Sequence, residues 1–174
     1  MTQSELLQDG IGRSLKFFGR TGYMVSITLR SQSEDAPDYQ IHIDTAASIV
    51  FGGGVYTSSA EINDNMAYGT CEFDKKVAQI TTSVRQFSLE KIFYDDAYCL
   101  HLIFSNGLEI HSLAATERGA EMWRIFLSWT ADIHLIGRPE GVEEEPSELS
   151  HQELDERKQY LERRMAERAV RLGD

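Results

Sequence analysis

The chain has 174 residues, of which 41% are hydrophobic and 26% are charged. This composition is close to that of globular proteins and gives room for one domain with a tail, which excludes a wholly disordered, collagen-like or disulfide-scaffold protein. Lysine and arginine number 17 against 28 aspartates and glutamates, a net charge of −11. Such a surface repels phosphate groups, so general binding to nucleic acids or anionic membranes is not expected.

The N-terminal stretch is acidic and lacks the basic and apolar regions of a secretory signal peptide. No apolar run approaches the roughly 20 residues that a membrane-spanning helix needs. Cys71 and Cys99 are too few for a disulfide framework and lack metal-ligand spacing, so we expect reduced, buried thiols. These features predict a cytoplasmic protein.

Alternating apolar and polar residues, the period of a half-buried strand, dominate residues 1–136, which we expect to form a β-rich body. The polar stretch Ser31–Asp38 is typical of an exposed hairpin loop, and Gly52–Gly54 of a flexible turn. Four strands are expected in the first part of the body: Tyr23–Leu29, Tyr39–Ile43, Ser48–Phe51 and Val84–Ile92.

A hairpin is predicted within Tyr98–Leu113, with one strand on each side of Ser105–Gly107. A two-residue turn would pair Leu102 with His111 and mix polar with apolar side chains. A three-residue loop, with its glycine in the left-handed conformation, pairs Leu102 with Ile110 and places the apolar side chains on one face. Hydrophobic matching therefore selects the three-residue loop.

The periodicity of residues 114–129 fits a helix and a strand equally well; we expect a loop or helical turn at Thr116–Ala120 and a strand at Trp123–Trp129. A lead strand followed by a hairpin occurs at Ile11–Ile43 and again at Ser83–Leu113, which raises the hypothesis of two related halves. The predicted fold class is α+β, mainly β: an antiparallel sheet or a partly open barrel.

A change of composition near Gly137 marks the expected end of the body. Residues 137–149 hold two prolines and an acidic triplet, and are predicted to be a linker. Ser150 and Glu153 have the spacing of a capping box, and the residues up to 172 favour a C-terminal helix. Its thin apolar stripe fits a solvated helix or a helix that docks a partner.

Several residues have the chemistry of a site without its full pattern. His101, Glu109 and His111 share the solvent face of the predicted hairpin, with Cys99 nearby, which are ligand types that zinc accepts. Polar residues at alternate positions also occur on any solvent-exposed face of a sheet. We therefore expect an ordinary solvated face here, not a metal site.

His42 and Asp44 share a strand face and would suit base catalysis, but no nucleophile is fixed near them. Gly52–Gly54 lacks the Lys-Ser/Thr that a phosphate-binding loop carries. We therefore expect no catalytic, cofactor or metal site, and no enzyme.

Acidic clusters occur in segments that we expect to be loops or linker: Glu72 with Asp74, Asp95 with Asp96, and Glu143, Glu144 and Glu145. Acidic clusters of this kind serve solubility or complement a basic protein partner. The sites predicted for partner binding are Asp95, Asp96, Glu143, Glu144 and Glu145.

The hairpin and the residues after it resemble a pattern in small β-rich immunity proteins of bacterial polymorphic-toxin systems. The matching residues are Leu100, Leu102, Phe104, Asn106, Gly107, Ile110, Glu121 and Trp123. The resemblance implies a non-catalytic protein that binds a cognate toxin and blocks its active site or substrate groove. A toxin that attacks nucleic acids presents a basic cleft, which an acidic inhibitor would fill.

Two other functions fit the sequence. An adaptor would dock its partner through the C-terminal helix, with the body as scaffold. A small-molecule-binding barrel or enzyme would require a sizeable apolar cavity.

Overall fold

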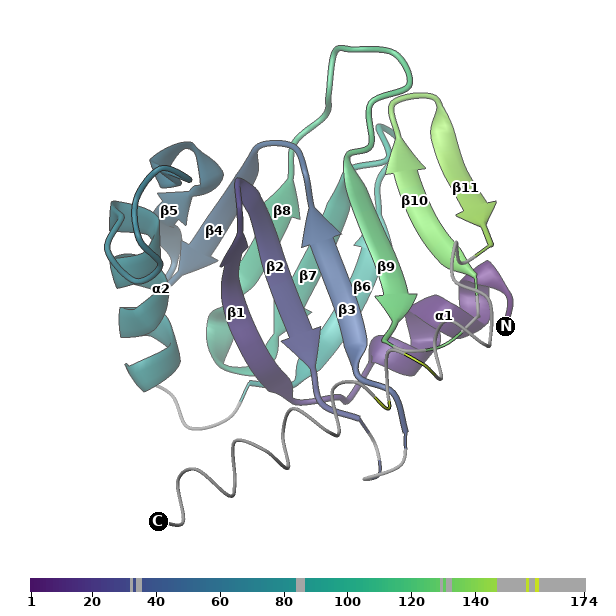
Figure 1. Cartoon of the computed structure of the whole chain (residues 1–174), viewed down its shortest axis with the longest axis horizontal. Helices are drawn as coiled ribbons and strands as arrows, with labels where there is room; N and C mark the ends of the chain where they lie inside the picture. Colours follow the sequence, from purple (N-terminus) through teal and green to yellow (C-terminus); the bar gives the residue numbers. More distant parts are fainter. Residues whose placement is uncertain are drawn as a thin grey trace.

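The computed structural model describes residues 1–31, 33, 36–83, 87–128, 130, 133–146, 156 and 159. The described residues form eleven strands in two antiparallel sheets, with two α-helices (Figure 1). The elements are α1 (Gln3–Gly10), β1 (Leu15–Thr21), β2 (Met24–Leu29), β3 (Tyr39–Ile43), β4 (Ala47–Phe51), β5 (Gly54–Ser58), the 3-10 turn η1 (Ser59–Glu61), α2 (Glu72–Ser83), β6 (Leu89–Tyr94), β7 (Leu100–Phe104), the 3-10 turn η2 (Ser105–Gly107), β8 (Glu109–Ser112), β9 (Trp123–Leu127), β10 (His134–Arg138) and β11 (Gly141–Glu145).

The six-stranded sheet has the order β1-β2-β3-β9-β10-β11, and the five-stranded sheet has the order β5-β4-β8-β7-β6. The predicted mainly-β class is confirmed. The predicted antiparallel pairing is present in two sheets instead of one, and the described strands form no closed barrel.

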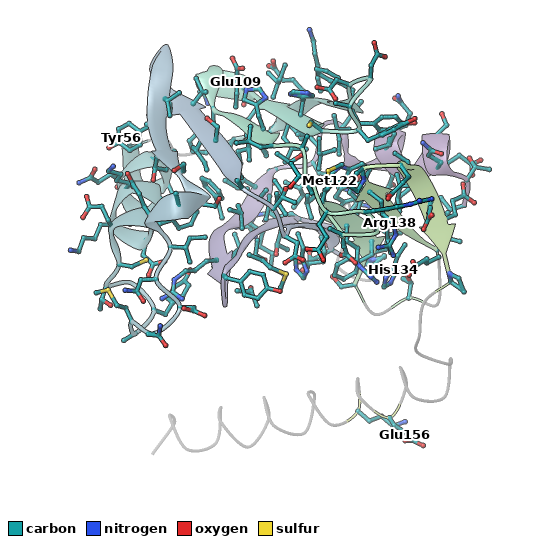
Figure 2. All side chains as sticks on the ribbon, turned by 90° about the horizontal axis from the view of Figure 1, so that it is seen from above. Tyr56, Glu109, Met122, His134, Arg138 and Glu156 are labelled. Carbon is teal, nitrogen blue, oxygen red and sulfur yellow. The ribbon has the colours of Figure 1, made fainter. Side chains whose placement is uncertain are left out.

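The two sheets pack face to face over one apolar core, as in a β-sandwich. Because side chains alternate along a strand, each sheet turns one apolar row inward. Figure 2 shows Glu109 and His134 on opposite outer faces of the sandwich. The inward row of the six-stranded sheet is Ile27, Ile41, Ile125 and Leu135, and that of the five-stranded sheet is Ile49, Ile110, Leu102 and Ile92.

The two helices close opposite sides of the sandwich (Figure 1). Helix α2 packs against β1 and β5, while α1 packs against β6. At the N-terminus of α1, the backbone N–H of Gln3 donates to Glu144 of β11, and its side-chain amide donates to Tyr94 of β6. Helix α1 therefore connects the last strand of one sheet to the edge strand of the other.

The two halves of the chain repeat one order of elements. In the first half α1 precedes the meander β1-β2-β3, and in the second half α2 precedes the meander β6-β7-β8. After each meander the chain crosses to the opposite sheet, so that β4 pairs with β8 and β9 pairs with β3. The crossings are alike: Asp44 N–H donates to Met122 O (2.9 Å), and Leu113 N–H donates to Ala46 O (2.7 Å). This repeated topology supports the hypothesis of two related halves.

The predicted hairpin register is confirmed. Leu102 pairs with Ile110, and Phe104 N–H donates to Leu108 O (2.9 Å). Gly107 has φ 78°, the left-handed conformation that the three-residue loop needs, and Asn106 shares it at φ 69°. The predicted strand after Trp123 is also present, as β9.

The prediction of an acidic linker is wrong for Gly137–Glu145. These residues form the end of β10 and all of β11, which pair as a hairpin from His134 with Glu145 to Arg138 with Gly141. The ordered body therefore continues to at least Glu145. The expected C-terminal helix lies outside the described residues apart from Glu156 and Gln159.

Candidate functional site on the outer face of the five-stranded sheet

Strand alternation places a row of polar and aromatic side chains on the outer face of the five-stranded sheet. Phe93 of β6 lies opposite His101 of β7, which lies opposite His111 of β8. The next residue in this row is Ser48 of β4, opposite His111. The inward neighbours of these residues belong to the core, so burial of the apolar row fixes which side chains face outward.

The two histidines form the centre of a hydrogen-bonded chain between two carboxylates. The Nδ1 atoms of His101 and His111 are 2.8 Å apart. The Nε2 atom of His101 lies 3.1 Å from Asp95 Oδ2, and the Nε2 atom of His111 lies 3.1 Å from Glu109 Oε2. Both imidazole side chains are part-buried, with 21% and 24% of their surface exposed.

The contacts of the two rings limit where hydrogens can lie on this chain. An ionised carboxylate only accepts, so each Nε2 carries a hydrogen and donates it. The contact between the two Nδ1 atoms then requires one proton, because two lone pairs repel and two N–H groups clash. In this arrangement one hydrogen lies between the two Nδ1 atoms, and the histidine pair links Asp95 to Glu109.

Asp95, predicted as a partner-binding residue, has a structural role in this chain. Its Oδ1 accepts hydrogen bonds from the backbone N–H groups of Ala97 (3.0 Å) and Cys99 (2.9 Å), which shapes the turn between β6 and β7. The hydrogen bond from His101, with these backbone donors, lowers the pKa of Asp95 below its ordinary value. Asp96, the next residue, is exposed at the tip of the same turn.

Phe93 is the residue of this face that the sequence analysis did not single out. Its ring stacks on His101, with centroids 4.9 Å apart, and 44% of its surface is exposed. An exposed aromatic beside two acidic residues was visible in the stretch from Phe93 to Asp96, but only the strand register places its ring on the outer face.

The other predicted acidic cluster lies on β11 and forms ion pairs within the chain. Arg138 Nε donates to Glu143 (3.0 Å) and its Nη2 donates to Glu145 (2.9 Å), contacts that raise the pKa of Arg138. Glu144 accepts from the backbone of Gln3. Because Gln3 also donates to Tyr94, next to Asp95, the two predicted acidic clusters lie on the same side of the sandwich.

The acidic pair Glu72 and Asp74 lies in the first turns of α2 instead of a loop. Asp74 is buried and pairs with Arg20 (3.0 Å), so only Glu72 belongs to the surface.

The remaining candidates do not combine into a site. His42 packs edge-on against Phe126, with centroids 5.2 Å apart, and its burial lowers its pKa. Gly52 and Gly53 form the tight turn between β4 and β5 with positive φ angles. Cys99 is buried, which raises the pKa of its thiol.

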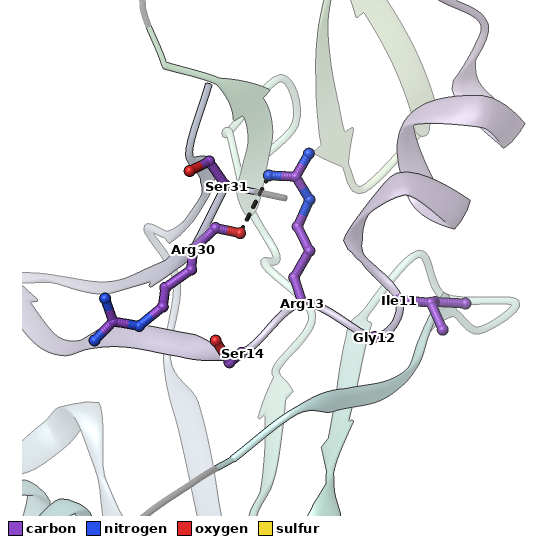
Figure 3. A pocket seen from close by; sticks show the side chains of 6 residues that line it. All are labelled: Ile11, Gly12, Arg13, Ser14, Arg30 and Ser31. Carbon is purple, nitrogen blue, oxygen red and sulfur yellow. Dashed lines mark hydrogen bonds between the residues drawn. The ribbon is translucent and has the colours of Figure 1, made fainter. Parts of the chain in front are cut away.

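A shallow, open depression of about 420 Å³ lies at the start of β1, lined by Ile11–Ser14, Arg30 and Ser31 (Figure 3). Its buried guanidinium, that of Arg13, donates to the Asp9 carboxylate (2.6 Å) and to the backbone carbonyls of Arg30 and Pro37. Arg13 therefore holds α1 against the loop between β2 and β3 and is committed to structure.

No protein-family model matches the chain, and no curated protein or solved structure matches it either. Among the described residues, no group of three or more His, Cys, Asp or Glu side chains is arranged to hold a metal ion. None of the helices in the described part of the chain has the length and apolar character needed to cross a bilayer.

Proposed function

We propose that this protein is a cytoplasmic immunity protein that binds a bacterial toxin through the outer face of its five-stranded sheet. The observation that carries the proposal is the exposed ring of Phe93, stacked on His101, with the exposed carboxylates of Asp95 and Asp96 in the turn that follows β6. An aromatic side chain with a charged rim is the usual anatomy of a protein-binding surface.

Charge gives this surface a preference among partners. Residues 1–146 contain 21 of the 28 acidic residues but only 11 of the 17 basic ones. A basic domain, such as a toxin that grips nucleic acid, is steered toward such a surface. The resemblance of Leu100–Trp123 to immunity proteins points to the same class of partner.

The cluster on β11 contributes less than the sequence analysis predicted. Glu143 and Glu145 already neutralise Arg138, so a partner would have to displace these ion pairs. We therefore assign the main contact to the β6–β7 turn and keep Glu143, Glu144 and Glu145 as its rim.

An affinity measurement with the partner captured from native cells tests this assignment. Asp96→Lys should weaken binding at least tenfold and reduce its dependence on salt, because a favourable charge pair becomes a repulsive one. Asp64→Lys, an equal change in an exposed loop on the α2 side, is the matched control. Equal affinities for both variants would contradict the proposal.

The adaptor remains the second candidate, since its docking helix would be the C-terminal segment. Deletion of residues 147–174 separates the two functions: an adaptor loses its partner, whereas an immunity protein still protects against its toxin. The small-molecule barrel lacks its predicted fold, because the described strands form two open sheets around a core filled by side chains.

A further inference from the structure

We propose that His101 and His111 bind one divalent transition-metal ion of the zinc, nickel or copper class through their Nδ1 atoms. This inference does not depend on the toxin partner. The Nδ1 atoms of the two rings face each other between β7 and β8 at 2.8 Å, with ring centroids 5.0 Å apart.

The ligand type and the spacing both suit such an ion. Imidazole nitrogen is a preferred ligand of zinc, nickel and copper. With Zn–N bonds of about 2.0–2.1 Å, two nitrogens on a tetrahedral ion stand about 3.3 Å apart. To bind the ion, the present 2.8 Å contact has to open by about half an ångström, and both rings have to turn so that their lone pairs leave the N–N line and meet on the ion.

The carboxylates supply the outer support that metal-binding histidines usually have. A histidine that ligates a metal through one ring nitrogen commonly donates its other N–H to a carboxylate or carbonyl, which fixes the tautomer and the ring orientation. Here both rings do so, His101 to Asp95 and His111 to Glu109, each at 3.1 Å. An ordinary solvated face of a sheet does not require each histidine to donate to a carboxylate in this way.

Charge and access also favour a cation. The site has two carboxylates on a chain of net charge −11, and both histidines are partly exposed. Since no third ligand joins them among the described residues, the protein would supply two ligands and leave the other positions to water. Such a site binds more weakly than a closed structural zinc site.

Metal binding displaces the hydrogen between the two Nδ1 atoms. The ion forms bonds to both Nδ1 atoms, and the proton that these atoms share passes to solvent, so one proton is released for each ion bound. Affinity therefore falls as the pH falls, because protons compete for the same nitrogens.

The test uses the full chain, labelled with ¹⁵N in its histidines and titrated with ZnCl₂. We expect one ion per chain, resonance changes at Nδ1 of His101 and His111 while both Nε2 atoms keep their hydrogens, and release of about one proton, measured calorimetrically in buffers of different ionisation enthalpy.

Variants locate the ion. His101→Gln and His111→Gln should each weaken binding at least tenfold, and Glu109→Gln by about 10–100-fold through loss of ring support. His42→Gln, on the opposite sheet, is the matched control and should leave the affinity unchanged. Absence of stoichiometric binding, or binding that the three variants do not alter while they keep the wild-type melting temperature, would overturn the proposal and leave the pair sharing a proton only.

Discussion

At the scale of single residues, an ion pair in the interior fastens α2 to the six-stranded sheet. Arg20 Nε lies 3.0 Å from Asp74 Oδ1, and only 5% and 3% of the two side chains are exposed. Asp74 also accepts from the backbone N–H of Gly69, while Arg20 donates to the carbonyl of Met66. Burial alone would raise the pKa of Asp74, but these hydrogen bonds lower it below its ordinary value.

This lowered pKa predicts the pH dependence of stability. The unfolded state binds the proton first as the pH falls, so the contribution of Asp74 is complete above its unfolded pKa and is lost as the pH falls through the lower folded value. Asp74→Asn should lower the urea midpoint strongly at pH 7, because a buried guanidinium then lacks its counter-charge. The difference from wild type should narrow toward pH 3.

Glu72→Gln is the control for this prediction, since Glu72 lies in the same turn of α2 with 58% of its side chain exposed. It should shift the midpoint far less at neutral pH. Similar shifts for the two variants would show that the buried pair does not stabilise the fold.

A second residue, Gly137, is required by its neighbour on the adjacent strand. A Cβ atom at this position would lie 2.0 Å from Cε2 of the fully buried Trp123, whose indole N–H donates to Tyr98 O. Gly137→Ala should therefore destabilise by about 1–3 kcal/mol or more through overpacking. Gly54→Ala, where no atom lies within 4 Å, is the matched control in chemical denaturation. A Gly137→Ala midpoint equal to that of the control would contradict this packing.

At the scale of elements, the loop between β7 and β8 sets the register that brings His101 opposite His111. Gly107 has φ 78°, where an L side chain is strained. Gly107→Ala should destabilise by about 1–2 kcal/mol, and Gly107→Asn by less, because asparagine tolerates this conformation better. Equal urea midpoints for the two variants would show that the loop does not require a left-handed conformation at residue 107.

Strands were predictable where one face is buried, because burial imposes a period of two on the sequence. The hairpin register followed from the same rule. Neither helix was predicted, although each had a readable signal: the capping box of Thr2 and Glu5 for α1, and the helical spacing of Phe73, Val77 and Ile80 for α2.

The hairpin of β10 and β11 could not be predicted from local sequence. Three consecutive glutamates favour a solvated linker, but tertiary contacts make that stretch compatible with a strand: Arg138 pairs with Glu143 and Glu145, and Glu144 accepts from the backbone of Gln3. The candidate site could be predicted only in part. Strand alternation predicts that both histidines face outward. Their contacts with Asp95 and Glu109 depend on the β6–β7 turn and on side-chain conformation, which the sequence pattern does not give.

At the scale of the whole molecule, each sheet is completed by strands of the other half. The chain can be divided between Asn63 and Asp64, in the exposed loop between η1 and α2. Each fragment alone should lack a cooperative thermal transition, because its sheet edges and core face stay uncovered; mixing them should restore one. A cooperative transition in either fragment alone would show that the halves are independent.

The proposed function assigns toxin neutralisation to the outer face of the five-stranded sheet. Its most direct measurement is the growth of a host that expresses the captured partner alone, with the wild-type chain, or with Phe93→Lys. We predict that the partner alone arrests growth, that the wild-type chain restores it, and that Phe93→Lys, confirmed as folded, does not. A harmless partner, or full protection by the folded Phe93→Lys chain, would contradict the claim.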